Sequence, residues 1–341
     1  MAYASVPLRD PRPDTARARA WTHVRGGRIG IVGPPGAATQ EVAVRIHDFT
    51  GGISRYVATG PLDSSDDAAA VNAGVDALAA DPGTAVIVVV ATFPAPDPAR
   101  AVLERLAAGT TPAVVCFVGA DAATVALGAV LGVAVETRSK PAALAAVITD
   151  GVDAVALDLH PLNEPLIAEV RALLGAEQRY IRGLFVSGGL RAEAVALARE
   201  RHADVREDAL EDGIDTPAHV FWDLGTESGT GPHAKTDAAE RSRRLVAAAS
   251  NPEVGVVVLD FVLGEGASDD PVGAMLPAIH AAKDAAAARG RHLEILGYVL
   301  GTDLDPQGLA TQTALLGKAG VTWASSATNT GLLAREFVIK G

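Results

Sequence analysis

Cysteine, methionine and aromatic residues are scarce in this chain. Its 341 residues include one cysteine and two methionines, and aromatic residues make up 4% of the total. The single cysteine, Cys116, excludes an internal disulfide. Because it lies in the apolar run 113–118, we interpret it as a small buried hydrophobic residue and not as a nucleophile. The few aromatic residues also argue against a β-sandwich filled by tyrosine and tryptophan.

Basic residues are too few for a nucleic-acid-binding surface. The chain has 29 Lys and Arg against 41 Asp and Glu, a formal net charge of −12, whereas phosphate contacts need a basic face. No apolar run approaches the roughly 18–20 residues of a membrane span. Residues 1–26 are rich in arginine and proline and lack the apolar core of a signal peptide. We therefore predict a cytoplasmic protein with an N-terminal arm at 1–26 and with neither nucleic-acid nor membrane partners.

Several common enzyme motifs are missing. The sequence has no G-x-x-x-x-G-K-[ST], no G-x-G-x-x-G after a strand, no His and Cys at zinc spacing and no G-x-S-x-G. These absences exclude P-loop enzymes, ordinary dinucleotide-binding domains and α/β-hydrolases. We predict neither a metal site nor a cofactor.

Apolar strands alternate with helical patterns along the whole chain, and the pattern occurs twice. Hydrophobic residues make up 49%, and fully apolar strands such as 84–93 are typical of a parallel sheet covered on both faces. The phrase "LAADPGTAVIVVVATF" is matched later by "AASNPEVGVVVLDFV", and "CFVGAD" by "YVLGTD". The sequence therefore predicts an α/β fold of two tandem flavodoxin-like, parallel-sheet domains at 27–150 and 178–341, joined near 149–180.

Each half contains a strand that ends in a glycine turn and runs directly into a helix. The two stretches are "GIVGPPGAATQEVAVRI" at 30–46 and "RGLFVSGGLRAEAVALARE" at 182–200. A helix start presents free backbone N–H groups and suits an anion, and parallel sheets bind ligands at the carboxyl ends of their strands. We predict that phosphate, or the phosphate of carbamoyl phosphate, binds between the two turns, and that Gly36 and Gly189 lie in equivalent turns. The predicted binding residues are Gly33, Gly36, Thr39, Ser187, Gly188 and Gly189.

Each of these residues also has a purely structural explanation. The glycines suit tight turns, and Thr39 can simply lie in the first helical turn. Arg191 is the only cation close to the second turn in sequence.

Five further polar residues at expected strand ends or loops are candidates. Asp223 can orient a carbamoyl amide or cap a helix. His233, in a glycine-rich loop, can act as an acid, a base or a phosphate ligand, or can simply be solvated. Asp260 ends an apolar strand, where a carboxylate is costly unless it is paired or catalytic. Asp305 suits an N-cap followed by Pro306, and Gln307 lies beside it as a candidate substrate ligand.

These phrases resemble the succinyl-CoA synthetase superfamily. "GIVGPPGAATQE" resembles the second domain of the α-subunit, and "FVSGGLRAEAV", "FWDLGTE" and "NPEVGVVVLDFV" resemble the C-terminal domain of the β-subunit. In that superfamily the two corresponding helices hold a phosphohistidine. The FdrA family carries both domains on one chain, and "QRYIRGLFVSGG", "GPHAKTD" and "GTDLDPQGLATQ" resemble that family over about residues 27–337.

Departures from the synthetases shape the functional expectation. The segment that holds their phosphohistidine corresponds to "GADAATVALGAV", which has no histidine, and Thr92 stands where the histidine's glutamate partner would fall. The chain has no counterpart of their CoA-binding and ATP-grasp domains, so we do not expect it to act alone as a CoA ligase.

The FdrA resemblance implies a subunit of an oxamate carbamoyltransferase. Such an enzyme phosphorolyses oxalurate to oxamate and carbamoyl phosphate. The implied ligands are phosphate or carbamoyl phosphate and a small carboxylate or amide substrate, and the implied partners are other carbamoyltransferase subunits. A homodimer is possible. The alternatives are a non-catalytic binding or scaffold subunit and a component of an NDP-forming acyl-CoA synthetase.

Overall fold

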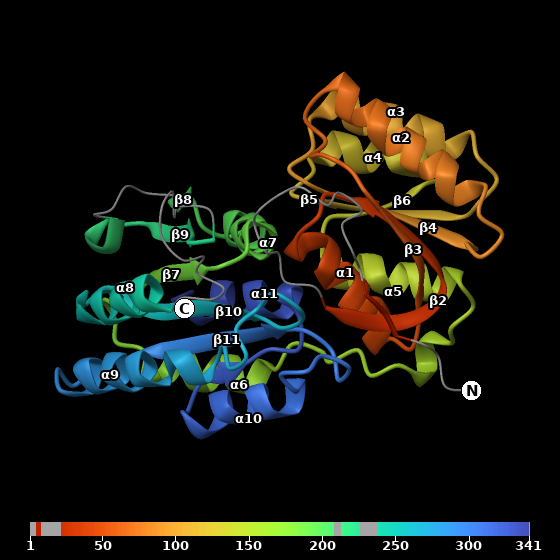
Figure 1. Cartoon of the computed structure of the whole chain (residues 1–341). Coiled ribbons are helices and arrows are strands. Elements are labelled where there is room, and N and C mark those ends of the chain that lie inside the picture. The colour runs from red at the N-terminus through yellow and green to blue at the C-terminus, as the bar shows by residue number, and fades with distance from the viewer. Residues whose placement is uncertain (1–4, 8–21, 208–212, 226–237, 341) are drawn as a thin grey trace. The chain divides into compact units, whose positions relative to one another are not determined.

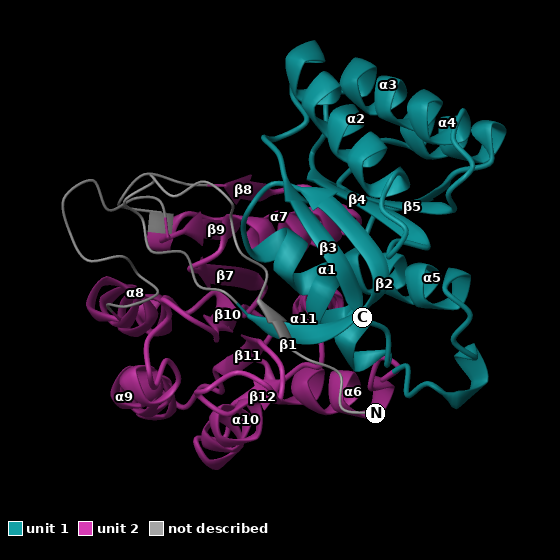
Figure 2. Ribbon diagram, turned by 45° about the vertical axis from the view of Figure 1, so that its right-hand side comes forward, with its two compact units in different colours: residues 1–159 teal, residues 160–341 magenta. Residues whose placement is uncertain are grey.

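The chain consists of two compact units, residues 1–159 and 160–341 (Figure 2). A computed structural model describes residues 5–7, 22–207, 213–225 and 238–340. The division falls within the stretch 149–180 in which the sequence places the join. Each unit is a parallel sheet with helices on both faces (Figure 1), so the predicted fold class is confirmed.

The first unit has a sheet in the order β3-β2-β4-β5-β6, all parallel, and β1 pairs antiparallel with the start of β2. Its elements are β1 Ser5–Pro7, β2 His23–Gly33, α1 Ala37–Asp48, β3 Ile53–Ala58, α2 Ser65–Ala79, β4 Val86–Thr92, α3 Pro96–Ala107, β5 Ala113–Val118, α4 Ala122–Leu131, β6 Ala134–Glu136, α5 Ser139–Thr149 and the short 3-10 helix η1 Ala154–Ala156. Helices α1 and α5 pack together on one face of the sheet, and α2, α3 and α4 cover the other (Figure 1). Strand β2 begins at His23, within the segment interpreted as an arm.

Local signals in the sequence define several helix ends in this unit. Ser64 and Asp67 form a capping box at the start of α2, which satisfies amide groups that the helix leaves open. Asp121 caps α4 by accepting a hydrogen bond from the Thr124 amide, and Gly132 ends that helix in the left-handed conformation. These two signals delimit helix α4 at Ala122–Leu131.

The second unit repeats this order and adds one strand. Its parallel sheet runs β12-β11-β10-β7-β9-β8, so β9-β7-β10-β11-β12 corresponds to the five parallel strands of the first unit and β8 extends the outer edge of β9. Its elements are α6 Glu164–Leu173, β7 Tyr180–Phe185, α7 Gly188–Arg199, β8 Val205–Glu207, η2 Gly213–Asp215, β9 His219–Asp223, α8 Ala239–Ser250, β10 Val254–Val262, η3 Gly273–Met275, α9 Leu276–Ala287, β11 Glu294–Leu300, α10 Leu309–Lys318, β12 Thr322–Trp323 and α11 Ala327–Phe337.

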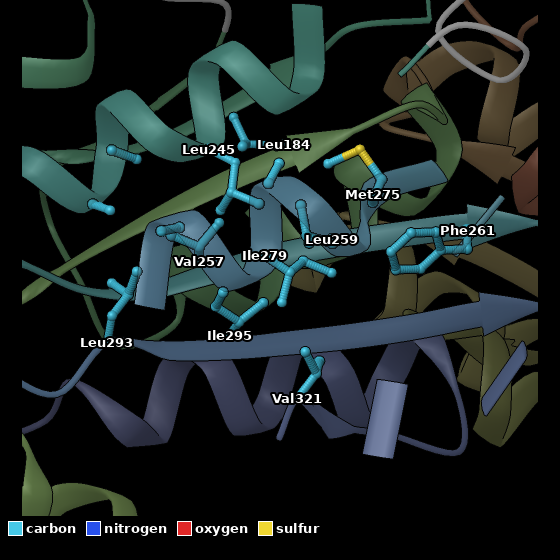
Figure 3. Packing of buried hydrophobic residues seen from close by; sticks show 14 of the residues in the cluster. Leu184, Leu245, Val257, Leu259, Phe261, Met275, Ile279, Leu293, Ile295 and Val321 are labelled. Atoms are coloured by element: carbon cyan, nitrogen blue, oxygen red, sulfur yellow. The ribbon is translucent and has the colours of Figure 1, made fainter. Parts of the chain in front are cut away.

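The largest buried cluster of the second unit lies between the sheet and helices α8, α9 and α10. Figure 3 shows Leu184, Leu259 and Phe261 of the sheet beside Leu245 of α8 and Ile279 of α9. Helices α7, α11 and α6 pack together on the opposite face. Every residue of β10 is buried, which explains why its sequence is apolar except for Asp260. This packing fixes the carboxyl ends of β7, β9, β10 and β11, where the sequence places its candidate residues.

Candidate functional site

The turn between β2 and α1 is held rigidly in the first unit. The Gly33 carbonyl accepts hydrogen bonds from the Thr59 amide at 3.0 Å and from the Tyr56 hydroxyl at 3.2 Å. The Thr39 hydroxyl donates to the Pro34 carbonyl at 2.6 Å. A Cβ atom at Gly33 would lie 2.9 Å from the Val90 carbonyl oxygen, so only glycine fits there. The hydroxyl of Thr39 thus closes the turn.

The start of α1 is open and carries no acidic residue. Gly36 is the N-cap, with φ 153°, and makes no side-chain cap. No other described residue comes within 4 Å of an ideal Cβ at Gly36. The first turn, from Ala37, contains no Asp or Glu, while the first intrahelical bond runs from the Gln40 amide to the Gly36 carbonyl at 3.0 Å. The amides before Gln40 therefore have no partner within the helix and carry the positive end of the helix dipole.

The corresponding turn between β7 and α7 has different chemistry. Ser187 is the N-cap, and Gly188 and Gly189 form the first helical positions. Gly36 and Ser187 are therefore equivalent N-caps, and Gly189 lies in the strand-to-helix turn that corresponds to the turn of Gly36, as predicted. The Ser187 side chain is 3% exposed, and its hydroxyl has no hydrogen-bond partner among the described residues.

A carboxylate lies at the start of α7. An ideal Cβ at Gly188 would lie only 2.5 Å from Oδ2 of Asp223, the last residue of β9. Oδ1 of Asp223 accepts a hydrogen bond from the Gly225 amide at 3.0 Å, and the side chain is buried. The N-terminus of α7 stabilises the negative charge of the Asp223 carboxylate. A second anion at this helix start would be repelled by that carboxylate. Arg191 lies 3.6 Å from Glu207 of β8, a carboxylate that also pairs with Arg199 at 2.8 Å.

Asp260, predicted as catalytic, is fully buried in β10 and paired. Its Oδ1 accepts hydrogen bonds from the Val186 amide at 2.7 Å and from Nη2 of Arg241 at 3.2 Å. Nε of Arg241 donates to the Leu184 carbonyl at 2.9 Å, and its guanidinium lies 4.9 Å from the centre of the Phe261 ring. Burial lowers the pKa of Arg241 to about 10, while Asp260 opposes this shift, so the Arg241 guanidinium is charged at neutral pH.

Sequence reasoning missed Arg241, although a signal for it exists. A carboxylate in the most apolar strand of the second half needs a cation, and Arg241 lies in the helix directly before that strand.

Asp305 and Gln307 stabilise loops at the carboxyl ends of β11 and β10. Helix α10 begins at Leu309 after Gly308, whose φ is 73°, so the prediction that Asp305 caps this helix is wrong. Asp305 instead accepts a hydrogen bond from the Thr302 amide at 2.8 Å. The Gln307 amide nitrogen donates to the Gly264 carbonyl at 2.9 Å, and its oxygen accepts from the Gly264 amide at 3.0 Å. Both side chains thus bind backbone. A direct role in substrate binding remains a prediction.

The turn after β5, where the resemblance expects a phosphohistidine, is covered by an aromatic ring. Thr92 ends β4, and the next residue, Phe93, has a positive φ of 45°. An ideal Cβ at Gly119 would lie 2.3 Å from Cε1 of Phe93, so the ring rests on that glycine. The Phe93 amide donates to the Val118 carbonyl at 2.7 Å.

Within each unit the structure brings several candidates together. Gly33, Gly36 and Thr39 share one turn of the first unit, while Ser187, Gly188, Asp223 and Asp260 share the carboxyl edge of the second sheet. That one phosphate is shared by the two turns remains a prediction. His233 lies outside the described residues.

The described residues also bear on metal binding and on membrane insertion. In the part of the chain that the structure describes, no group of three or more His, Cys, Asp and Glu residues is arranged to hold a metal ion. No described helix is both long and apolar enough to cross a membrane.

The second unit is similar to a known family. Residues 184–337 match the CoA-ligase family. The stretch begins in β7 and ends in α11, so it contains both the Ser187 turn and the Asp260–Arg241 pair. The similarity thus extends over the fold around the second turn.

Longer proteins also resemble the chain. YahF of Escherichia coli (strain K12) is 46% identical over 329 residues, which cover 93% of this chain and 63% of YahF. The chain therefore spans less than two thirds of that relative. An acetyl-coenzyme A synthetase of Ca. Korarchaeum cryptofilum, solved with phosphate and ADP, is 14% identical with a TM-score of 0.32, covering 92% of this chain and 64% of its own. An ATP citrate lyase of Methanosaeta concilii is 12% identical with a TM-score of 0.30, covering 92% and 50%. TM-scores this low carry no functional argument.

Proposed function

We propose that this chain is a component of an enzyme that makes or splits an acyl phosphate, and that the acyl phosphate is carbamoyl phosphate. The observation that carries the proposal is the difference between the two helix starts. The start of α1 is open and free of acidic residues, whereas the start of α7 holds the Asp223 carboxylate. The first suits an anion, and the second suits a ligand with an N–H donor.

Phosphate binds at the start of α1 in this proposal. The amides that follow Gly36 donate to its oxygens, and the absence of acidic residues from the first turn leaves the helix dipole uncompensated. Each such helix start contributes up to ~2 kcal/mol in a partly buried site. The affinity of the chain alone is therefore weak.

The amide-bearing substrate binds in the second unit. Asp223 accepts a hydrogen bond from an N–H of the carbamoyl or amide group, and the Ser187 hydroxyl donates to a ligand oxygen. A plain dianion is disfavoured there, because Asp223 repels it. This preference for an N–H donor distinguishes a carbamoyl or amide substrate from a simple carboxylate.

The reaction that fits is the phosphorolysis expected for the FdrA family. A phosphate oxygen forms a bond to the carbamoyl carbon of oxalurate. The bond from that carbon to the bridging nitrogen breaks, and the nitrogen takes up a proton and leaves as the amide of oxamate. No covalent phosphoenzyme is needed, which agrees with the lack of a histidine after β5. Partner subunits supply the remaining groups of the enzyme.

An acyl-CoA synthetase component is the second candidate, and the CoA-ligase match of residues 184–337 favours it. Its substrate would be a carboxylate without an N–H donor. Asp223 is then a structural cap of α7, and the preference for amides disappears.

Calorimetry on the whole chain separates the candidates. We expect phosphate and oxamate to bind, and succinate, which has no N–H donor, to bind at least about tenfold more weakly than oxamate. Equal binding of oxamate and succinate, or binding of CoA, contradicts the carbamoyl proposal. Co-purification with partner subunits followed by an oxalurate phosphorolysis assay then tests the activity. A chain that binds these ligands but adds nothing to that activity is a binding subunit.

A further inference from the structure

The carboxyl end of β7 is held by side chains in place of the sheet. The parallel ladder between β7 and β10 stops at the pair Leu184 and Leu259. Beyond it, the Leu184 carbonyl accepts from Arg241 and the Val186 amide donates to Asp260. The Leu184 carbonyl and the Val186 amide thus bind Arg241 and Asp260 of one buried ion pair.

Val186 is also held from its other side. An ideal Cβ at Gly225 would lie 2.4 Å from the Val186 carbonyl oxygen, so the Gly225 turn packs directly on this peptide group. Gly225 in turn donates its amide to Asp223. Val186 directly precedes Ser187. It is therefore fixed between the Asp260–Arg241 pair and the loop that orients Asp223.

We propose that Arg241 and Asp260 are positioning residues that set the place of Ser187 and Gly188 relative to Asp223. The inference rests on the proposed function of that turn. Apolar side chains in place of Arg241 and Asp260 would also pack against strand β7. They would leave the Leu184 carbonyl and the Val186 amide without these hydrogen-bond partners. The charged pair fixes both groups and thereby the direction in which the chain leaves the sheet. Asp260 acts through Val186 and does not touch the substrate.

The chain contains a matched control at the opposite end of the same strands. Gln178 is equally buried, precedes β7, and donates from its amide to the Val254 carbonyl of β10 at 3.1 Å and to the His292 carbonyl at 2.7 Å. Like the ion pair, Gln178 connects the β7 segment to β10 through hydrogen bonds. It does so before the amino end of β7, whereas Ser187 follows the carboxyl end. Loss of Gln178 disturbs the same sheet and leaves the turn intact.

The test compares Arg241→Gln, Asp260→Asn and Gln178→Leu in the whole chain. We expect all three to lower the midpoint of thermal unfolding. Hydrogen–deuterium exchange of a peptide covering 184–190, measured without ligand, should become about tenfold faster in Arg241→Gln and stay unchanged in Gln178→Leu. Asp260→Asn keeps an oxygen for the Val186 amide, so its effect should be smaller than that of Arg241→Gln.

Ligand binding gives the second measurement. With oxamate as the probe, Arg241→Gln should lose about tenfold in affinity, and Gln178→Leu none, once unfolded protein is accounted for. Equal exchange and equal binding in Arg241→Gln and Gln178→Leu would show a merely structural role. If the parent chain binds no oxamate, the proposed function fails, while the exchange data still decide the positioning role. If Arg241→Gln does not fold, Asp260→Asn carries the same comparison.

Discussion

Gly188 has no room for a side chain, because an ideal Cβ on this residue would lie 2.5 Å from Oδ2 of the Asp223 carboxylate. Asp223 cannot move freely, since its other oxygen accepts a hydrogen bond from the Gly225 amide. The last residue of one strand thus fills the space beside the first helical residue after another. The two positions should behave as one unit in mutagenesis.

Gly188→Ala should destabilise the chain by about 1–3 kcal/mol, because the new methyl group displaces a bound carboxylate. Asp223→Ser makes room, so Gly188→Ala in that background should cost much less. Urea unfolding of the two single variants and the double variant measures the coupling. Additive costs would mean that Asp223 does not limit the space at Gly188.

Asp223→Asn should change the ligand preference of the chain. Removing the negative charge from the start of α7 lets this helix accept an anion, so phosphate should bind more tightly, and oxamate should bind about tenfold more weakly after loss of its charged acceptor. Calorimetry with both ligands measures the change. Asp121→Asn is the control, because Asp121 is also a carboxylate at a helix start, but it caps α4 in the first unit by accepting from the Thr124 amide. Identical ligand preferences in the two variants would remove Asp223 from the site.

Gly36→Asp and Gly36→Asn form a matched pair at the start of α1. Both introduce the same strain, since Gly36 has a positive φ of 153°, and both side chains enter a region free of other described residues. They differ in charge alone. We expect Gly36→Asp to bind phosphate at least about tenfold more weakly than Gly36→Asn, because its carboxylate takes the position of the anion. Equal affinity in calorimetry would show that phosphate does not bind at this turn.

The fold was predictable because both halves carry the same strong pattern. Continuous apolar strands such as β4 and β10 can only be central strands of a covered parallel sheet, and capping signals such as Asp121 define helix ends. The elements that the sequence did not predict are short or depend on distant contacts. Strand β8 has three residues and forms only because β9 offers a free edge, and β1 forms by pairing with β2.

The candidate site was predictable only in part. The position of Asp223 at a strand end follows from the order of the strands, whereas β10 continues two residues beyond Asp260, to Val262. The partner of each carboxylate does not follow from the sequence, because Asp260 pairs with Arg241 from a helix and Asp223 reaches Gly188 from a neighbouring strand. Pro306 after Asp305 predicts a helix cap at Asp305, but α10 begins only at Leu309, after the positive φ of Gly308.

His219, at the amino end of β9, should make the stability of the chain depend on pH. Burial, the neighbouring His202 and Arg182 lower its pKa to about 3 in the folded state, whereas an unfolded histidine has a pKa of about 6.5. Between these values the unfolded chain binds the extra proton. This group's contribution therefore falls as pH falls, by about 1.4 kcal/mol per pH unit.

His219→Gln should remove that dependence. The variant keeps an acceptor for the Ile181 amide, which donates to Nδ1 of His219 at 3.3 Å. The free energy of unfolding of the variant relative to the parent should rise by about 2 kcal/mol between pH 6.5 and pH 4.5. Urea unfolding at a series of pH values measures it, with the exposed His280→Gln as control. Parallel curves for parent and variant would show that His219 is protonated in the folded chain.

The contact between Phe93 and Gly119 has an evolutionary consequence. A histidine introduced at Gly119 would have to adopt the positive φ of 73° and place its Cβ inside the Phe93 ring. Removing Phe93 first would uncover the end of β5 before any new side chain could fill the space. Either order passes through a less stable chain, so selection for stability opposes both. Descendants of this sequence can thus place a histidine in this turn only through a less stable intermediate or by two changes at once.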